Sequence, residues 1–372
     1  MGFEVDFLPV GDGEKCGDAI AVRYGEPGAY TVMVYDGGTQ KSGAALVDHI
    51  KTYYKTSYVD HVVNSHPDQD HSSGLSVVLE ELKVGTLWMH RPWKYSHLIL
   101  DYFRDGRITS QSLKQRLQDK MSAAYNLERI ATRKGISIQE PFQGTAIGKF
   151  HVLSPEENWY IHDLIADFEK SPDTKAREAA LVAADSARFA PLKKFTEAAR
   201  KAVTEWVAAK WGVDLLREDV ETSAENESST ILYAYMNDHS EALLLTGDAG
   251  VRALTRALDY LDSHNISASR HIKFYQIPHH GGRHNVSTSV LDRLVGPRLA
   301  AEPDRFSKVA YASASQKSGY PRHMVKNAFL MRGADVCSTR GGSIRYQRGM
   351  PDRGWKPLDK ATFSTHVEAW DD

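Results

Sequence analysis

The chain has 372 residues, of which 41% are hydrophobic and 25% are charged, so it can bury one large core or two smaller ones. Its 46 basic and 48 acidic side chains give a formal net charge of −2, which excludes a strongly basic nucleic-acid binder and requires any phosphate contact to be local. The sequence carries no basic leader and no apolar run of membrane-spanning length, which predicts a cytoplasmic protein without membrane contact.

The first part of the chain alternates short β-like runs with turns. The stretch SHPDQDH at residues 65–71 follows the apolar-leaning run YVDHVVN. This order puts the stretch on a loop at the carboxyl end of a strand, where side chains can converge on a cleft. We expect strands over residues 3–10, 18–25 and 30–38, a helix over 45–55, and another strand over 58–66.

Two blocks of helical pattern interrupt the strand-rich sequence, at about residues 98–135 and 156–222. A predicted strand pair lies between them, near residues 136–155. We expect both blocks to be insertions in a single domain that spans the whole chain, and the second offers a surface for a protein partner. Its basic run at 193–201 is either the solvated face of a helix or a local patch that steers phosphate.

Strand-forming runs return after the second helical block. They lie near residues 229–238, 241–250, 273–282, 308–315 and 334–347, with helices near 251–261 and 324–332. Strands in both halves, separated by helices, predict an α/β (α+β) fold in which two β-rich halves pack face to face and are covered by helices.

Three predicted strands end in residues that can bind a metal ion. They lead into SHPDQDH at 65–71, TGDAG at 246–250 and PHHGG at 278–282. Glycine or another small residue follows each time, which lets the backbone approach a ligand closely. One such strand end is common, whereas three favour a shared site. The alternative is structural: the first stretch caps a helix, and Asp248 caps the helix that follows it.

The donor atoms in these stretches suit divalent cations. Imidazole nitrogen and carboxylate oxygen bind ions such as zinc and manganese, and crowded carboxylates repel one another unless a cation lies among them. Asp248 stands alone after an apolar strand, so it is the natural bridge between two ions. A bridging water in such a site is deprotonated near neutral pH and attacks phosphorus or carbonyl carbon, which indicates hydrolysis.

The order of these motifs resembles the metallo-β-lactamase superfamily, and within it the hydrolase domain of ComEC-type competence proteins. The features that carry the likeness are FLPVG, GDAIAV, VYDGG, SHPDQDH, LLLTGD and PHHGG, which occur between residue 3 and about residue 346. The resemblance implies an αββα sandwich that binds two divalent metal ions, zinc or manganese. It also implies a phosphodiesterase or nuclease acting on DNA or nucleotides. Because the chain lacks a membrane channel, a freestanding enzyme, for example in defence against foreign DNA, fits better than DNA uptake.

The resemblance also implies the metal ligands. Asp70 would orient the attacking water in addition to binding metal. Asp68 occupies a position where relatives carry histidine, and its charge favours harder ions such as manganese over zinc alone. The implied ligands are His66 and Asp68 for one ion, Asp70, His71 and His279 for the other, and Asp248 as the bridge.

Further residues are expected to contact the substrate or the leaving group. His323 either protonates a leaving oxygen or holds a phosphate oxygen, unless it is an ordinary surface histidine. The expected substrate contacts are Asn226 and Ser229, which match an NxxS motif of the ComEC-type subgroup, and His280, Arg283 and His284, which adjoin the third motif.

Two other functions remain open on the sequence. The same metals could hydrolyse a small lactone, thioester or β-lactam, or the chain could be a non-catalytic module that binds partners around a retained metal site. The motifs do not encode the oligomeric state or a choice among DNA, RNA and cyclic nucleotides.

Overall fold

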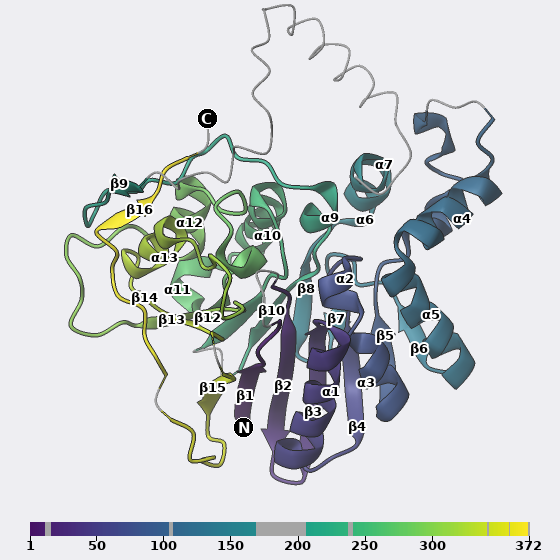
Figure 1. Cartoon of the computed structure of the whole chain (residues 1–372), viewed down its shortest axis with the longest axis horizontal. Helices are drawn as coiled ribbons and strands as arrows, with labels where there is room; N and C mark the ends of the chain where they lie inside the picture. The colour runs from purple at the N-terminus through teal and green to yellow at the C-terminus, as the bar shows by residue number, and fades with distance from the viewer. Residues whose placement is uncertain are drawn as a thin grey trace, which may run out of the picture.

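The computed structural model describes residues 1–11, 16–103, 107–168, 206–236, 241–340, 342–356 and 358–370. Over these residues the chain forms two seven-stranded sheets. Figure 1 shows the two sheets at the centre of the molecule and helices on either side of them. This arrangement confirms the prediction of two face-to-face sheets covered by helices.

The first sheet has the strand order β15-β1-β2-β3-β4-β5-β6. Neighbours from β15 to β3 pair antiparallel, and neighbours from β3 to β6 pair parallel. Pro27 and Gly28 form the tight turn between β2 and β3, where Gly28 has φ 87°. The strands are β1 Gly2–Phe7, β2 Ala19–Glu26, β3 Ala29–Gly37, β4 Tyr58–Val63, β5 Lys83–Trp88, β6 Ser137–Gln139 and β15 Ile344–Arg348.

The second sheet has the order β14-β13-β12-β11-β10-β8-β7 and repeats the pattern of the first. Neighbours from β7 to β11 pair antiparallel, and those from β11 to β14 pair parallel. The strands are β7 Ala146–Ile147, β8 Phe150–Ser154, β10 Ile231–Tyr235, β11 Ala242–Leu245, β12 Ile272–Gln276, β13 Lys308–Ala312 and β14 Ala334–Ser338.

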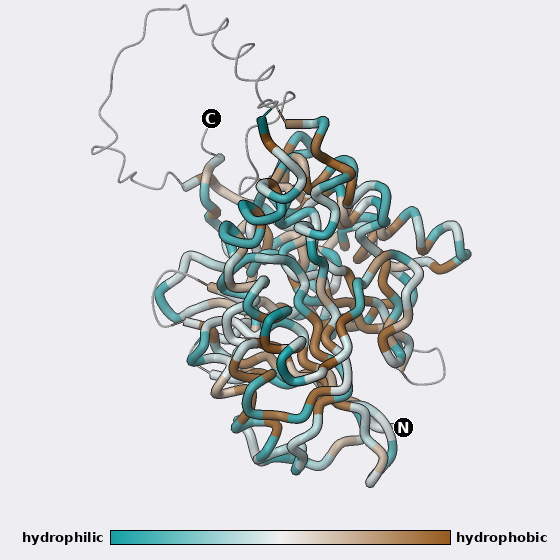
Figure 2. The backbone as a smooth tube through the Cα atoms, turned by 90° about the vertical axis from the view of Figure 1, so that its right-hand side faces the viewer, coloured by the Kyte–Doolittle hydropathy of each residue, from teal (hydrophilic) through white to brown (hydrophobic). Residues whose placement is uncertain are grey.

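The inner faces of the two sheets share a core of alternating strand residues. Phe3, Val5 and Phe7 of β1 are fully buried on one face, as the two-residue period of a strand requires. The ring of Phe7 packs edge-on against Phe274 and Tyr311 of the second sheet, with centroids 5.9 and 5.6 Å away. Figure 2 shows hydrophobic residues gathered mainly in the interior, with hydrophilic segments around them.

Helices cover the outer faces because their apolar side chains recur on one side. In α10, for example, Ala253, Leu254, Ala257, Leu258 and Leu261 are buried, which is the spacing of an amphipathic helix. The first sheet carries α1 Gln40–His49, α3 Leu75–Glu81 and α5 Ser122–Lys134, with α4 Ser110–Lys120 packed against α5, and the second carries α10 Val251–Ser263, α11 Ala268–His271, α12 Thr288–Leu294 and α13 His323–Leu330.

Short helical turns connect the larger elements. They are η1 Ile50–Tyr54, α2 Gln69–Ser72, η2 Pro92–Tyr95, η3 Leu100–Tyr102, α6 Glu157–Trp159, η4 Tyr160–Leu164, α7 Ile165–Asp167, α9 Ala224–Glu227 and η6 Pro278–Gly281. In the part of the chain that the structure describes, every helix is too short or too polar to cross a membrane.

The two blocks predicted as helical differ in outcome. The first is helical over α4 and α5. Residues 169–205 of the second, including the basic run at 193–201, lie outside the described residues. The prediction of helix through residue 222 is wrong at its end, because β9 Trp206–Ala208 pairs antiparallel with β16 His366–Glu368. A partner strand from the far end of the chain overrides local helix propensity there.

Glycines let α2 approach its neighbours closely. A Cβ at Gly74 would lie 1.9 Å from the carbonyl oxygen of Gly37, and one at Gly17 would lie 2.2 Å from that of Asp70. No side chain fits at such distances. The glycines therefore fix the position of the helix that carries the first predicted ligands.

Candidate metal centre

The three predicted strand ends meet at one edge of the sandwich. The side chains after β4, β11 and β12 converge there because parallel strands present their carboxyl ends at the same edge of a sheet. His66 Nε2 and His71 Nε2 lie 3.9 and 3.4 Å from Asp248 Oδ2, and His280 Nε2 lies 3.8 Å from Asp248 Oδ1. Asp248 is thus the centre of the cluster.

Several groups of side chains bring their ligand atoms within 4.8 Å of one another. His66 Nε2 also lies 3.7 Å from Asp68 Oδ2, so both halves of the first motif face the cluster. The groups are Asp70, His71 and His280; Asp248, His279 and His280; Asp36, His66 and His71; and Asp18, His71 and Asp248.

Asp36, at the end of β3, fixes the tautomer of His71. Its Oδ2 lies 2.9 Å from His71 Nδ1, and because a carboxylate can only accept, the imidazole donates through Nδ1. The other ring nitrogen, Nε2, faces the cluster and would bind a cation through its lone pair once the imidazole is neutral. A carboxylate behind a histidine is the usual support of a metal-binding imidazole.

Ser65 does the same for His66. Its hydroxyl donates to Asp36 Oδ2 at 2.6 Å, so at the 2.9 Å contact with His66 Nδ1 the hydroxyl oxygen must accept. His66 is then protonated on Nδ1, and its Nε2 is free to bind a cation. One carboxylate, Asp36, thereby orients both imidazoles.

The cluster leaves buried polar atoms unsatisfied. His66 Nε2, His71 Nε2 and Asp248 Oδ1 are buried and have no hydrogen-bond partner among the described residues. Each such atom costs on the order of 1–3 kcal/mol if nothing binds it. A divalent cation would satisfy all three, so these residues fit a metal centre and are compatible with a metal-dependent hydrolase.

The buried charges of the cluster depend on one another. Burial would raise the pKa of Asp248, but His71, His279 and His280 hold it well below its ordinary value. Burial would lower the pKa of His71, but the nearby carboxylates of Asp248 and Asp36 hold it well above its ordinary value. Burial, together with nearby Asp248 and Asp36, raises the pKa of Asp18 to about 7. The acids thus require positive charge among them.

Two imidazoles are held in the neutral form. Burial, with the nearby charge of His71, lowers the pKa of His66, and burial lowers the pKa of His280 to about 3. A histidine must be neutral to bind a metal ion. Both side chains are therefore ready to act as ligands at neutral pH.

The two histidines of the PHHGG stretch occupy different positions. The side chain of His280 is 4% exposed and that of His279 is 30% exposed. His279 Nδ1 donates to Asp248 Oδ2 at 2.6 Å. Both residues have positive φ, 47° and 60°, which is rare outside glycine and marks a strained turn. The sequence predicted His280 as a substrate contact. In the structure its ligand atom lies within 4.8 Å of those of Asp70 and His71.

Asp18 and Asp36 were not predicted as site residues. Asp18 Oδ2 accepts a hydrogen bond of 2.8 Å from Gln276 Nε2, and Gln276 Oε1 accepts from the backbone nitrogens of Thr246 and Gly247. This network links the start of β2 to the loop that carries Asp248. The only sequence signal was a lone acid in GDAIAV and in VYDGG, and such acids are common in turns.

Asn226 and Ser229 adjoin the cluster. Ser229 Oγ accepts from the backbone nitrogen of Asp248 at 3.1 Å, and Asn226 Nδ2 lies 3.3 Å from His279 Nδ1. They reach the site because β10 runs antiparallel to β11, so the start of β10 lies beside the end of β11. Whether they touch substrate stays a prediction.

Arg283 and His284 follow the PHHGG stretch in the chain, and their side chains contact the C-terminal segment. Arg283 Nη1 donates to the carbonyl oxygen of Ala369 at 2.5 Å, and its guanidinium lies 4.9 Å from the ring centroid of Trp370. The ring of His284 is 5.4 Å from the same indole, and the guanidinium of Arg217 is 5.0 Å from it. No sequence pattern indicated this role for Trp370.

His323 faces the small β9–β16 sheet. Its ring lies 5.1 Å from that of Trp206, and its Nδ1 is 3.4 Å from the carbonyl oxygen of His366. Tyr320, in the loop before α13, packs edge-on near the two histidines of the PHHGG turn, with its ring 6.0 Å from that of His279. The catalytic role of His323 stays a prediction.

Helix capping does not account for the acidic residues. Asp68 is at the N-cap of α2, but its side chain makes no capping hydrogen bond. The N-cap of α10 is Gly250, two residues after Asp248. The carboxylate of Asp248 instead points into the cluster of histidines.

No family model matches the chain, and no curated protein matches it. Among solved structures it is similar to the metallo-β-lactamase fold protein YhfI from Bacillus subtilis, with 9% identity and a TM-score of 0.42 over 94% of this chain and 100% of that one. It is also similar to metallo-β-lactamase SMB-1 bound to 2-mercaptoethanesulfonate, with 7% identity and a TM-score of 0.32 over 77% and 87% of the two chains. It is similar as well to MEM-A1, a subclass B3 metallo-β-lactamase isolated from a soil metagenome library. The identity is 12% and the TM-score 0.30, over 78% of this chain and 83% of that one. Similarities at this level assign neither a family nor an activity to this chain.

Proposed function

We propose that the chain is a divalent-metal-dependent hydrolase that cleaves phosphodiester bonds in DNA or nucleotides. The observation that carries the proposal is the set of buried, unsatisfied donor atoms on His66, His71 and Asp248, which come from separate strand ends and face one another. Action in the cytoplasm against foreign DNA is the setting that the sequence resemblance implies.

The proposed ligand set differs from the sequence-based one at a single position. His280 replaces His279, because the ligand atoms of Asp70, His71 and His280 lie within 4.8 Å of one another and the ring of His280 is the more buried of the two. The set is His66, Asp68 and Asp248 for one ion of zinc or manganese, and Asp70, His71, His280 and Asp248 for a second.

Bound ions would lower the pKa of a water molecule to near neutrality and neutralise charge on the reacting phosphoryl group. The half-buried carboxylate of Asp70 would accept a hydrogen bond from the attacking water and so orient it. His279, which is partly exposed and tied to Asp248 through Nδ1, would use its Nε2 to hold a phosphoryl oxygen.

Cationic groups near the PHHGG turn favour a phosphodiester over a neutral carbonyl substrate. Arg283 directly follows Gly282, which packs tightly against His279, since a Cβ at Gly282 would lie 2.8 Å from His279 Cδ2. The backbone nitrogen of Arg322 donates to the carbonyl oxygen of Gly281 at 3.0 Å, and its guanidinium lies over the ring of Tyr320. A guanidinium group that reached a substrate at the metal centre would suit a phosphate anion better than a lactone or β-lactam.

The test compares ester classes on one preparation of the full chain. Chelated protein is reloaded with manganese or zinc and assayed against bis-p-nitrophenyl phosphate, a lactone and nitrocefin. We expect metal-dependent cleavage of the phosphodiester, its loss in the Asp70→Ala, His71→Ala double variant, and its retention in His264→Ala, a change at an exposed histidine of the α10 C-cap.

The other outcomes point to the alternatives. Cleavage of the lactone or nitrocefin alone would assign a carbonyl hydrolase. A metal-loaded protein that is inert towards every ester would identify a binding or scaffold module. Activity that survives the double variant would contradict the proposed site.

A further inference from the structure

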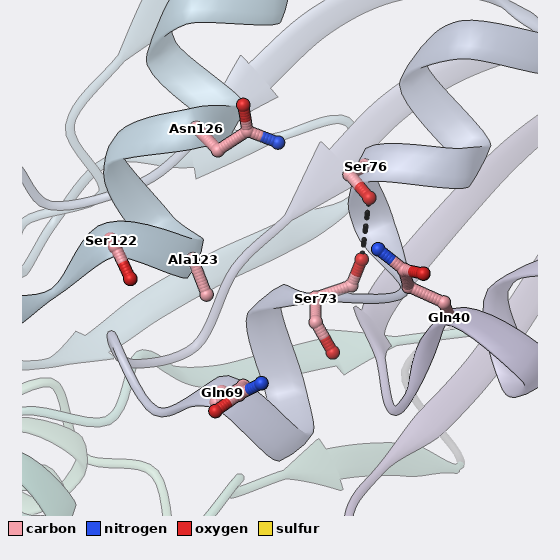
Figure 3. Close-up of a pocket in the computed structure, with 7 residues that line it drawn as sticks. All are labelled: Gln40, Gln69, Ser73, Ser76, Ser122, Ala123 and Asn126. Carbon is pink, nitrogen blue, oxygen red and sulfur yellow. Dashed lines mark hydrogen bonds between the residues drawn. The ribbon is translucent and has the colours of Figure 1, made fainter.

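A cleft lies between the helix that carries the first metal-ligand motif and the first helical block. Its volume is about 220 Å³, and its walls come from α1, α2, α3 and α5. Figure 3 shows Gln69 and Ser73 on one side, Ser122 and Asn126 of α5 across from them, and Gln40 and Ser76 closing the third side.

The chemistry of the lining is uniform. Within the described residues the walls carry three carboxamides and three hydroxyls, with Ala123 as the one apolar side chain and no charged or aromatic group. A phosphate would find no cation here, an acyl chain no apolar wall, and a stacked ring no aromatic platform. The lining suits a neutral group that both donates and accepts hydrogen bonds.

Several of these side chains are available to a ligand. The carboxamides of Gln40, Gln69 and Asn126 make no hydrogen bond to any other part of the described chain. In contrast, Ser76 and Ser73 are already engaged, since their hydroxyls donate to the carbonyl oxygens of Ser73 and Gly38 at 2.6 and 3.0 Å. A carboxamide presents a donor and an acceptor in one plane, which matches the edge of a nucleobase.

The position of the cleft relates it to the metal centre. Gln69 stands between Asp68 and Asp70 in the chain, and it projects away from His71 because two helical residues turn by about 200°. The cleft therefore lies across α2 from the cluster, about one helix diameter, or ~10 Å, away. A polynucleotide held at the cluster would reach it with a neighbouring nucleotide.

We propose that this cleft between α2 and α5 is a subsite that holds a nucleobase of the substrate by its edge, through the carboxamides of Gln40, Gln69 and Asn126. The proposal rests on the phosphodiesterase function proposed above, and it extends that function by naming a base-recognition site outside the metal centre. The volume equals that of roughly seven liquid waters at about 30 Å³ each, which is room for one base.

The kinetic test uses a Gln40→Ala, Asn126→Ala double variant of the manganese-loaded full chain, which leaves α2 unchanged. The substrates are thymidine 5′-p-nitrophenyl phosphate, which carries a base, and bis-p-nitrophenyl phosphate, which carries none. We expect the ratio of kcat/KM for the first over the second to fall about 10-fold, as the loss of two hydrogen bonds implies. Gln115→Ala, an exposed change on α4, should leave this ratio at the wild-type value.

A binding test stands apart from catalysis. Free nucleosides are titrated into the wild type and the double variant by calorimetry, alongside ribose and a phosphate control. Binding of nucleosides that the double variant loses supports the base site, whereas equal binding of ribose assigns a sugar site and overturns it. If no nucleoside binds, or the kinetic ratio stays constant while the phosphodiester is still cleaved, the subsite is wrong and the proposed function stands.

Discussion

Asp36 Oδ2 lies 2.9 Å from His71 Nδ1, and this pair connects the end of β3 to helix α2, which carries the proposed ligands Asp70 and His71. Asp36 is fully buried and adopts a left-handed backbone conformation with φ 57°. It also accepts from both the backbone nitrogen and the hydroxyl of Ser65. Its carboxylate thereby sets the orientation of His71 and, through Ser65, of His66.

Replacing Asp36 by asparagine should weaken metal binding without removing a ligand. An amide holds the histidine less firmly and makes it a weaker base, and loss of such a support costs about 10–100-fold in metal affinity. Titration of the chelated protein with zinc or manganese measures the change. Asp60→Asn is the matched control, because Asp60 accepts from the backbone nitrogen of Val32 in the same sheet and lies outside the cluster. Equal affinity in both variants would contradict the role assigned to Asp36.

The two histidines of the third motif should differ in their effect on metal binding. His280→Ala removes the more buried ring, which belongs to the group formed with Asp70 and His71, and we expect about one bound ion per chain to be lost. His279→Ala should leave the metal content nearly intact and act mainly on kcat. Metal analysis after gel filtration, with a thermal unfolding scan on each variant, separates these outcomes. The reverse order would restore the ligand set expected from the sequence.

The main features of the fold and the centre of the site could be predicted from the sequence for a physical reason. Each apolar run that ends in His66, Asp248 or His279 combines a buried strand with a sudden polar residue, and both signals are local. The contacts of Asp36 with His71, 35 positions away, and of Trp206 with the C-terminal strand depend on tertiary pairing. Local propensity carries no information about such partners.

The sequence also did not indicate which of the two histidines in PHHGG is the more buried. His279 and His280 are identical side chains in adjacent positions, and only the strained turn, with positive φ at both residues, decides which ring points inward. The contact of Gly281 with Pro321, where a Cβ would lie 2.4 Å from Pro321 Cβ, holds that turn in place. Its partner loop lies about forty residues further along the chain.

Arg283 should contribute to substrate binding more than to metal binding. Its guanidinium is held by Ala369 and Trp370, and its backbone follows the PHHGG turn, so Arg283→Ala should raise KM for a phosphodiester roughly 10-fold while metal content stays at the wild-type level. The dependence of KM on salt should also become weaker, since a phosphate contact is lost. Steady-state kinetics at several salt concentrations test this.

Trp370→Ala removes the other partner of the Arg283–Trp370 contact and can be compared with Arg283→Ala. It leaves the charge of Arg283 in place but removes the indole that lies beside the guanidinium of Arg283 and that of Arg217. A smaller rise in KM than in Arg283→Ala, with an unchanged salt dependence, would fit a positioning role for Trp370. An effect of Arg283→Ala on kcat alone would argue against the proposed substrate contact.

A buried ion-pair network on the first sheet should make stability depend on pH. Burial would raise the pKa of Asp6, but hydrogen bonding and charge from His49 and the charge of Arg353 hold it below its ordinary value. The Arg353 guanidinium bonds to Asp6 and Glu4 at 3.1 and 2.7 Å. The other members of the network are Arg23 and Arg345, which bond to Glu4, and Tyr54, which donates to Asp6.

The sign of the effect follows from the depressed pKa of Asp6. An unfolded aspartate has a pKa of about 3.9, so between that value and the lower folded value the unfolded state binds more protons, and acid favours unfolding. The stabilisation from Asp6 is complete above about pH 5 and is lost as the pH falls through the folded pKa. Arg353→Met should lower the free energy of unfolding at pH 7 by about 3 kcal/mol, because a buried partner is removed.

The same change should make the loss in acid shallower, because without Arg353 the pKa of Asp6 moves back towards its unfolded value and the proton difference between the two states shrinks. Urea unfolding of both proteins from pH 7 to pH 3 measures this; the acidic groups that Arg353 does not contact cancel in the comparison, which therefore reports on Asp6 together with Glu4. Arg348→Met is the matched control, since its side chain is 51% exposed and pairs with Glu241 at the surface, where such pairs contribute about 0–1 kcal/mol. Parallel curves for the wild type and Arg353→Met would mean that the other partners of Asp6, His49, Tyr54 and Arg345, hold its carboxylate in the charged form without Arg353.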